Sequence, residues 1–279
     1  MNKLSVIILT KNAETLIADC IDSVSFADEI IVVDDGSTDR TAELAKHLGA
    51  KVYSFIRESF AERRNFGLKK AKYKWVLYID SDERVSKELQ ENILSVVKDR
   101  VKRFWTGKNH KSVSGEEGND ESRIKNQNEE KTTVVAYRLQ RKNFYLGKHE
   151  WPKIEELERL FDREALVEWV GAVHETPIVK GEIGALPGFL RHYTHQDLST
   201  MVEKTIAWSK IEAELRLKAN HPKMSFWRFF RVMLTAFYDS YIKQKGYKVG
   251  TAGLIESIYQ AFSMFITYAR LWELQNTRN

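Results

Sequence analysis

Three acidic side chains lie within four positions directly after an apolar run, in the stretch WVLYIDSDERV. Asp80, Asp82 and Glu83 follow Trp75–Ile79. Like charges this close repel one another, so the arrangement costs free energy unless a cation lies among them. Residues i and i+2 of a strand point to the same side, so Asp80 and Asp82 can approach one ligand together. The stretch predicts an Mg²⁺ or Mn²⁺ site that serves a diphosphate, and the alternative is a helix N-terminus acidified to suit the helix dipole.

Other polar clusters also follow apolar runs. The runs that predict strands are Leu4–Leu9, Glu29–Val33, Lys51–Phe55 and Trp75–Ile79, and helical patterns between them span Leu16–Val24, Asp39–Leu48 and Phe60–Ala71. Strands that alternate with helices indicate an α/β fold, with a mainly parallel sheet and helices on both faces. Ligands bind such a sheet at the carboxyl ends of its strands. The clusters Thr10–Asn12, Asp34–Asp35 and Asp80–Glu83 all fall there.

The remainder of the chain divides by composition. Residues 107–131 contain only two aliphatic side chains, so they predict a solvated, mobile insertion. A strand is expected again from Thr132, followed by the aromatic-rich stretch NFYLGKHEWP. From Leu198 onward the apolar residues recur at helical spacing to the end. We therefore expect a catalytic domain at 1–196 and a C-terminal helical, amphipathic region at 197–279.

Composition excludes several classes of protein. The chain of 279 residues is long enough for one large domain, or for one domain with an appendage. Neither a P-loop, nor GxGxxG, nor a Cys/His cluster is present. The single cysteine, Cys20, rules out an internal disulfide and lies on an apolar helical face, which favours a core position over a nucleophile. The N-terminus does not resemble a signal peptide, so we expect a reducing, cytosolic setting.

The C-terminal region is strongly basic. Between Arg216 and Lys248 there are eight Lys or Arg residues, eight aromatic residues and one acid. Nucleic-acid binding, attachment to an anionic lipid surface and simple packing on the catalytic domain all compete as interpretations. Bulky apolar residues at helical spacing favour the membrane surface over nucleic acid. Glu256 and Arg270 interrupt the longest apolar stretch, so we expect attachment to a membrane without a span.

Several ordered motifs resemble one enzyme family. LSVIILTKNAE, DEIIVVDDGSTDRT and ERRNFGLKKAKYKWVLYIDSDERV resemble family 2 glycosyltransferases, which have the GT-A fold. The resemblance is dense over the N-terminal third, and it resumes at LERLFDREALVEWVGAVHE, at HYTH and in the C-terminal stretch GYKVGTAGLIESIYQAFSMFITYARLWE. The combined pattern is similar to a bacterial subgroup that includes lipopolysaccharide-core β-glucosyltransferases.

The resemblance implies a nucleotide-sugar site at the strand ends. The residues that would form it are Thr10, Asn12, Asp34, Asp35, Arg64 and Asp80. Asp34 or Asp35 would accept a hydrogen bond from the base or ribose, with Arg64 nearby. The alternative for these two aspartates is N-capping of the helix that begins near Asp39, and the alternative for Arg64 is a solvated charge on a helix.

The resemblance also implies catalytic and metal-binding roles. Asp82 would bind the metal, and Asp80 would approach the metal, the ribose or the diphosphate. Glu175 would be the base that deprotonates the acceptor hydroxyl in an inverting transfer, unless it is a surface acid at a strand end. His174 would orient Glu175 or contact the diphosphate, and His192 would add a metal or phosphate contact. Plain structural roles are the alternatives for both histidines.

The acceptor is the part of the reaction on which the sequence departs from the subgroup. The stretch LGKHEWPKIEELER keeps Trp151 and Pro152 but lacks the subgroup's glycine pair. Lys148 and Trp151 are the candidate acceptor residues. We expect a glycolipid or polyprenyl-linked saccharide as acceptor, used at the inner face of the cell membrane in cell-envelope polysaccharide synthesis. The alternatives are a metal-dependent nucleotidyltransferase and a non-catalytic, nucleotide-binding adaptor on the membrane surface.

Overall fold

The computed structural model of the protein describes residues 2–57, 59–98, 134–171 and 175–277. The insertion expected at 107–131 lies outside the described residues. The chain forms two compact units. The sheet unit comprises Met1–Gln140 and Glu156–Leu190, and the helical unit comprises Arg141–Glu155 and Arg191–Asn279.

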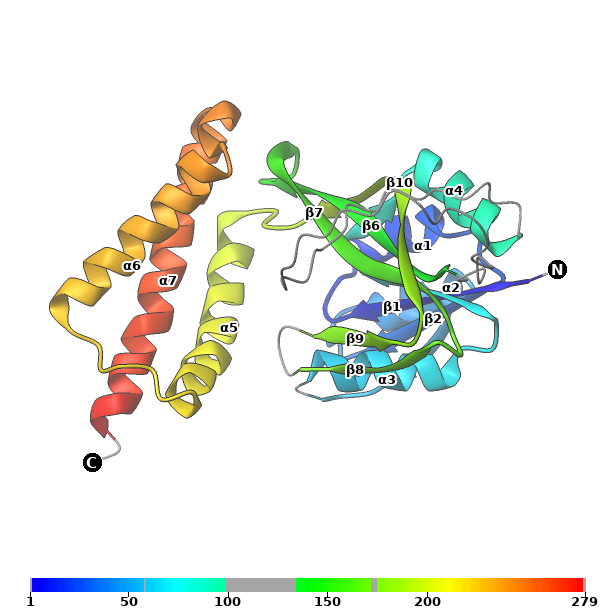
Figure 1. The fold of residues 1–279 in the computed structure, drawn as a ribbon, viewed down its shortest axis with the longest axis horizontal. Helices are drawn as coiled ribbons and strands as arrows, with labels where there is room; N and C mark the ends of the chain where they lie inside the picture. Colours follow the sequence, from blue (N-terminus) through cyan, green and yellow to red (C-terminus); the bar gives the residue numbers. More distant parts are fainter. Residues whose placement is uncertain (1, 58, 99–133, 172–174, 278–279) are drawn as a thin grey trace, which may run out of the picture. The chain divides into compact units, whose positions relative to one another are not determined.

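The first half of the sheet unit is a parallel sheet with helical crossovers (Figure 1). Its strands are β1 (Leu4–Thr10), β2 (Glu29–Asp34), β3 (Lys51–Ser54) and β4 (Trp75–Asp80), in the order β3-β2-β1-β4. The connecting helices are α1 (Ile17–Ser23), α2 (Thr41–His47) and α3 (Phe60–Lys70). β1 pairs in parallel with both β2 and β4, which confirms the α/β fold expected from the sequence.

Helices cover both faces of this sheet. Successive residues of β4 alternate between two apolar clusters: Leu77 and Ile79 pack with residues of α1 and of α4 (Lys87–Val97), whereas Tyr78 packs on the other face with residues of α3. A strand that is buried on both faces reads as a continuous apolar run. Gly67 lets α3 lie close to β1, because a Cβ at this position would be 2.6 Å from Ile7 Cγ2.

Antiparallel strands extend the sheet beyond β4. The order continues with β7 (His149–Asp162), β6 (Val134–Tyr145), β10 (Glu182–Tyr193) and β5 (Glu83–Val85). A separate antiparallel pair is formed by β8 (Leu166–Val170) and β9 (Thr176–Val179).

The acidic stretch after β4 does not begin a helix. Glu83 starts the short strand β5, and α4 begins only at Lys87, where Ser86 Oγ accepts a hydrogen bond from Leu89 N. The alternative of an acidified helix N-terminus was therefore wrong. Because Asp80, Asp82 and Glu83 precede β5 or lie in it, they do not serve the dipole of α4.

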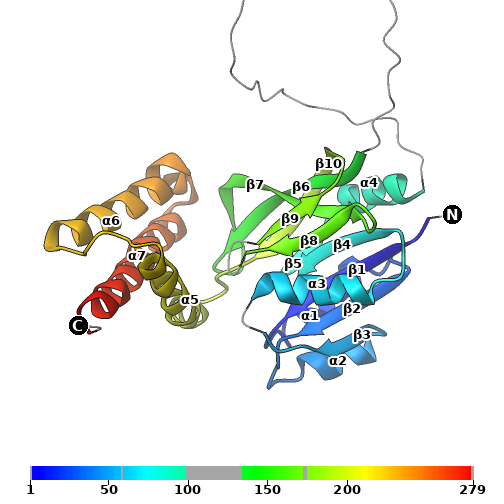
Figure 2. The same cartoon turned by 60° about the horizontal axis from the view of Figure 1, so that its bottom comes forward.

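The helical unit contains three long helices. These are α5 (Leu198–Lys218), α6 (Phe226–Tyr238) and α7 (Thr251–Thr277), with a π-helical turn η1 (Asp239–Lys243) and a 3₁₀ turn η2 (Gly246–Val249) between α6 and α7. α7 contacts both α5 and α6 (Figure 2), and the helices confirm the pattern expected from Leu198 onward. In the described part of the chain, no helix combines the length and apolar character needed to cross a bilayer.

Candidate active site

The loops after β1 and β2 hold one another through side chains. Asn12 adopts a left-handed backbone conformation with φ of 48°, which asparagine tolerates better than most residues. Its Oδ1 accepts a hydrogen bond from Thr38 N at 2.8 Å, and its own N–H donates to Ser37 Oγ at 2.9 Å. Thr10 is buried, and no described residue forms a hydrogen bond with its hydroxyl. Thr10 and Asn12 therefore lie together at the predicted strand ends.

Asp34 and Asp35 have different partners. The Asp34 carboxylate accepts a hydrogen bond from Ser37 N at 3.1 Å and closes the turn after β2. Asp35 Oδ2 lies 2.8 Å from Arg63 Nη1, so the arginine beside it is Arg63 and not the expected Arg64. At the start of α2, Asp39 Oδ1 accepts a hydrogen bond from Thr41 N at 3.0 Å. Neither Asp34 nor Asp35 caps that helix.

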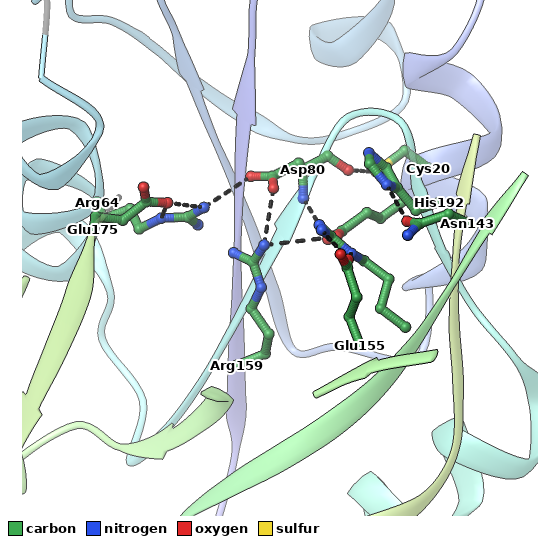
Figure 3. Close-up of polar contacts among 10 residues, drawn as sticks. Cys20, Arg64, Asp80, Asn143, Glu155, Arg159, Glu175 and His192 are labelled. Carbon is green, nitrogen blue, oxygen red and sulfur yellow. Dashed lines mark hydrogen bonds and ion pairs between the residues drawn. The ribbon is translucent and has the colours of Figure 1, made fainter. Parts of the chain in front are cut away.

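Asp80 lies between two buried arginines (Figure 3). Its Oδ1 is 3.2 Å from Arg64 Nη2, and its Oδ2 is 3.0 Å from Arg159 Nη2. Arg159 also lies 3.6 Å from Glu83 Oε1, and the other Glu83 oxygen accepts a hydrogen bond from Asp80 N at 3.0 Å. The chain itself thus supplies two guanidinium groups as cations for Asp80 and Glu83.

Arg64 connects Asp80 with Glu175, as Figure 3 shows. Its Nε and Nη2 lie 2.8 and 2.7 Å from Glu175 Oε1. The guanidinium also lies over the ring of Trp169, with its carbon 4.9 Å from the ring centroid. Burial works against the charge, but Asp80 and Glu175 outweigh burial and raise the pKa of Arg64. Arg64 is 1% exposed, so it is not a solvated helix charge.

Asn65 holds strand β8, in which Trp169 lies. Asn65 Oδ1 accepts a hydrogen bond from Trp169 N at 2.8 Å, and its Nδ2 donates to Trp169 O at 2.9 Å. α3 is thereby fixed to β8, which leads to Glu175. His174, the other predicted catalytic residue of this segment, lies outside the described residues.

Asp82 lies half-buried on the turn between β4 and β5. Among the residues that the structure describes, no group of three His, Cys, Asp or Glu side chains is placed to hold a metal ion. Mg²⁺ commonly needs only one or two protein carboxylates when substrate phosphates supply further ligands. Asp82 and Asp80 meet that requirement, although both Asp80 oxygens already accept hydrogen bonds from arginines. The donor set fits a metal that arrives with a diphosphate.

His192 belongs to the helical unit, and its ring is oriented by Asn143. Nδ1 lies 2.7 Å from Asn143 Oδ1 and donates a hydrogen bond to this amide oxygen. The candidate acceptor residues lie on the same unit: Lys148 is exposed at the β6–β7 turn, whereas Trp151 is 2% exposed.

Cys20 is a core residue, as expected. It is fully buried, and its Sγ donates to the carbonyl oxygen of Asp80 at 3.5 Å. Burial raises the pKa of the thiol far above its usual value. The side chain therefore supports the end of β4 and has no nucleophilic character.

Two arginines of the site were missed in the sequence. Arg63 was passed over for its neighbour, although two successive arginines within ERRNFG were visible. Arg159 lies in the strand segment LERLFD, where it is buried beside Leu160 and Phe161. An arginine directly before the apolar pair Leu160 and Phe161 is the signal that could have revealed Arg159, since a buried charge needs a partner.

Known proteins resemble the chain in sequence. A family model described as "Glycosyl transferase family 2" matches residues 5–160. An uncharacterized glycosyltransferase of Rickettsia typhi is 29% identical over 275 residues, which cover 98% of this chain and 88% of the relative. The lipopolysaccharide core biosynthesis glycosyltransferase LpsC of Rhizobium meliloti is 24% identical over 283 residues, which cover 97% of this chain and 92% of LpsC.

Two solved structures match the chain with low TM-scores. S. aureus TarS 1-349 in complex with UDP-GlcNAc matches with a TM-score of 0.42 and 14% identity, over 99% of this chain and 92% of that one. Glucosyl-3-phosphoglycerate synthase from Mycobacterium tuberculosis, in complex with Mn²⁺, UDP-glucose and phosphoglyceric acid, matches with a TM-score of 0.30 and 27% identity, over 34% of this chain and 40% of that one. Because the family model spans more than half of the sequence and the sheet has the expected topology, the chain belongs to glycosyltransferase family 2 and has the GT-A fold.

Proposed function

We propose that the protein transfers a sugar from a nucleotide diphosphate to a glycolipid or polyprenyl-linked saccharide, with inversion at the anomeric carbon. The observation that carries the proposal is the Arg64 network, which joins Asp80 at the end of β4 to Glu175. The carboxyl end of a parallel strand is where such sheets bind nucleotides. The name of the relative LpsC, which refers to lipopolysaccharide core biosynthesis, supports an acceptor of the cell envelope.

The loops after β1 and β2 would bind the nucleoside. Thr10 and Asn12 would contact the base, and Asp35, held by Arg63, would accept a hydrogen bond from the base or ribose. Asp34 already closes the turn after β2 and would act mainly by shaping this loop. The buried Thr10 hydroxyl supports this assignment, because an atom of the nucleoside would form the hydrogen bond that no described residue provides.

Asp82 and Asp80 would hold Mg²⁺ or Mn²⁺ together with the diphosphate oxygens. The ion, when bound, supplies Lewis-acid neutralisation of the charge on the leaving diphosphate. Arg64 Nη1 is buried, and no described residue accepts a hydrogen bond from it. An oxygen atom of the nucleotide sugar would accept this hydrogen bond as well. His192 stays the predicted residue for a further metal or phosphate contact.

Glu175 would be the general base. Both hydrogen bonds from Arg64 end on Oε1, so Oε2 is the atom that would accept the proton of the acceptor hydroxyl. The hydroxyl oxygen would bond to the anomeric carbon as the bond from that carbon to the diphosphate breaks. His174 would assist Glu175 as its neighbour in the chain.

The helical unit would attach to an anionic membrane surface, where a lipid-linked acceptor lies. α6 leaves bulky side chains exposed, including Phe226 at 67%, Trp227 at 77% and Leu234 at 67%. The basic residues between Arg216 and Lys248 complement anionic headgroups. Aromatic rings beside basic residues are typical of helices that lie in a membrane interface.

A panel of nucleotide sugars tests the proposal. The purified protein is incubated with each donor and Mn²⁺, and release of nucleoside diphosphate is followed with and without glycolipid. We expect slow hydrolysis of one donor, and faster release when an acceptor is present. Release of pyrophosphate would identify a nucleotidyltransferase instead. Binding to liposomes without hydrolysis or transfer of any donor would identify a non-catalytic adaptor.

A further inference from the structure

The helical unit contains a cavity of about 650 Å³. The tip of the β6–β7 hairpin forms one wall with Tyr145 and Trp151, and residues of α6, η1 and α7 form the others. The volume falls within the range of roughly 300 to 1,000 Å³ that is usual for small-molecule sites. The cavity lies wholly within residues of one unit and has room for a small saccharide.

The aromatic wall is fixed in place by the chain. Trp151 Nε1 donates a hydrogen bond to Gln244 Oε1 at 3.0 Å, and the Tyr145 ring meets the Trp151 ring edge to face at 5.0 Å. Gly246 allows η2 to approach, because a Cβ there would be 2.7 Å from Trp151 Cη2. A wall whose rings are already immobilised loses little side-chain entropy when a ligand binds.

The acidic side chains of the cavity already have nitrogen partners. The pairs are Glu155 with Arg141 at 2.6 Å, Asp239 with Lys243 at 2.7 Å and Glu256 with His195 at 3.2 Å. Carboxylates in such pairs still have lone pairs that accept hydrogen bonds from hydroxyl groups. Because these carboxylates already have nitrogen partners, the cavity is a poor site for a metal cation.

The carboxylate of Glu256 in α7 is buried, and its burial costs folding free energy. It is 1% exposed, and burying a carboxylate costs several kcal/mol unless hydrogen bonds compensate. Gln260 Nε2 donates to its Oε1 at 2.6 Å. His195 Nδ1 lies 3.2 Å from both oxygens and sits in a left-handed backbone conformation with φ of 49°. An apolar residue would serve helix packing at lower cost, so recognition of a polar ligand explains this group better.

We propose that the cavity binds a sugar residue of the acceptor saccharide. The half-buried Tyr145, with the buried Trp151 behind it, offers an apolar surface for the C–H groups of a sugar ring, and Gln260, Glu256 and Glu155 offer partners for its hydroxyls. This inference rests on the proposed function, because it assigns the acceptor of that reaction to the helical unit. It also gives Trp151 a role as the back of a saccharide site, whereas exposed Lys148 is not among the cavity residues.

A cavity-filling variant tests the inference. Thr235 is exposed on α6 and lines the cavity, so Thr235→Trp fills it without disturbing the core. Ala207→Trp is the control, because Ala207 is exposed on α5 of the same unit and does not line the cavity. Binding of methyl glycosides of common hexoses and of N-acetylglucosamine is measured on the full chain by saturation-transfer NMR. Inorganic phosphate is the comparison ligand.

We expect at least one glycoside to bind, Thr235→Trp to weaken this binding about tenfold or more, and Ala207→Trp to leave it unchanged. Donor hydrolysis by Ala207→Trp should stay at the wild-type rate. If circular dichroism shows that Thr235→Trp is misfolded, glycoside binding is measured on Gln260→Ala instead. This variant removes one amide that would contact the hydroxyls of the sugar. Three results would each overturn the inference. The first is equal glycoside binding by the wild type and the folded cavity variants, and the second is binding of phosphate alone. The third is a protein that hydrolyses its donor but binds no glycoside. Failure of donor hydrolysis for every nucleotide sugar would instead overturn the proposed function.

Discussion

Replacement of Glu175 by glutamine separates the role of a base from that of an anchor for Arg64. The amide oxygen of Gln can still accept the hydrogen bonds that Arg64 Nε and Nη2 make to Oε1 at 2.8 and 2.7 Å. The variant loses a Coulomb attraction on the order of 4 kcal/mol at an effective dielectric constant of 20. Arg64 keeps Asp80 as an ionic partner at 3.2 Å, so we expect a net loss in unfolding free energy of about 1 to 3 kcal/mol.

The loss in turnover should be larger than the loss in stability. General-base catalysis contributes about 10² to 10⁴ in rate, equivalent to about 2.7 to 5.4 kcal/mol in the barrier. We expect kcat to fall by that factor while the KM for the donor stays unchanged, and the acid limb of the pH–kcat profile to disappear. Glu168→Gln, on the exposed side of β8, is the control. A folded Glu175→Gln enzyme with wild-type turnover, or with an unchanged acid limb, would refute the assignment of the base.

Four further changes test other parts of the molecule. Asp82→Ala should abolish transfer with unchanged circular dichroism, as should EDTA on the wild type, and full activity in either case would refute the metal role. Arg159→Met should lower the unfolding free energy by about 3 to 5 kcal/mol in urea titrations, because it removes a buried partner of Asp80; a loss below about 1 kcal/mol would contradict the importance of this pair. Burial disfavours the Glu29 carboxylate, but hydrogen bonds from Lys51 and Ser5 outweigh it and lower its pKa, so its contribution to stability is present above the unfolded value of about 4.3 and is lost as pH falls below it. Glu29→Gln should therefore lose less stability than wild type between pH 7 and the acid range, and parallel acid losses would contradict this account. Trp227→Ser should weaken sedimentation with anionic vesicles about tenfold, since burial of one large side chain contributes about 1.5 to 3 kcal/mol; equal sedimentation would exclude this face from the membrane contact.

β1, β2 and β4 were predictable because a strand that is buried on both faces reads as a nearly continuous apolar run, whereas β3 is exposed at Lys51 and Ser54. β1, β2, β3 and β4 were all expected within a residue or two of their observed ends. β5 was missed because a strand of three residues, two of them charged, has no period to detect. Short strands of this kind are stabilised by their neighbours and not by local propensity.

Partners within the site were less predictable than its position. Arg63 and Arg64 are adjacent in sequence, but successive helical residues point about 100° apart, so they reach different strand ends. The pairing of Asp80 with Arg159 joins residues 79 positions apart, which no local pattern records. The buried position of Trp151 could not be predicted for the same reason, because its partner Gln244 lies 93 positions away. The boundary expected at residue 196 remains a proposal, and the helical unit also includes Arg141–Glu155.

The two guanidinium groups beside Asp80 bear on how a newly synthesised chain matures. In small zinc-dependent domains the ligands stay apart until the ion arrives, so the apoprotein is unfolded. Here Arg64 of α3 and Arg159 of β7 pair with Asp80 at the end of β4 when these elements pack. The sheet can therefore fold in a cell that is short of divalent ions. Scarcity of such ions would then slow this enzyme without exposing it to proteases.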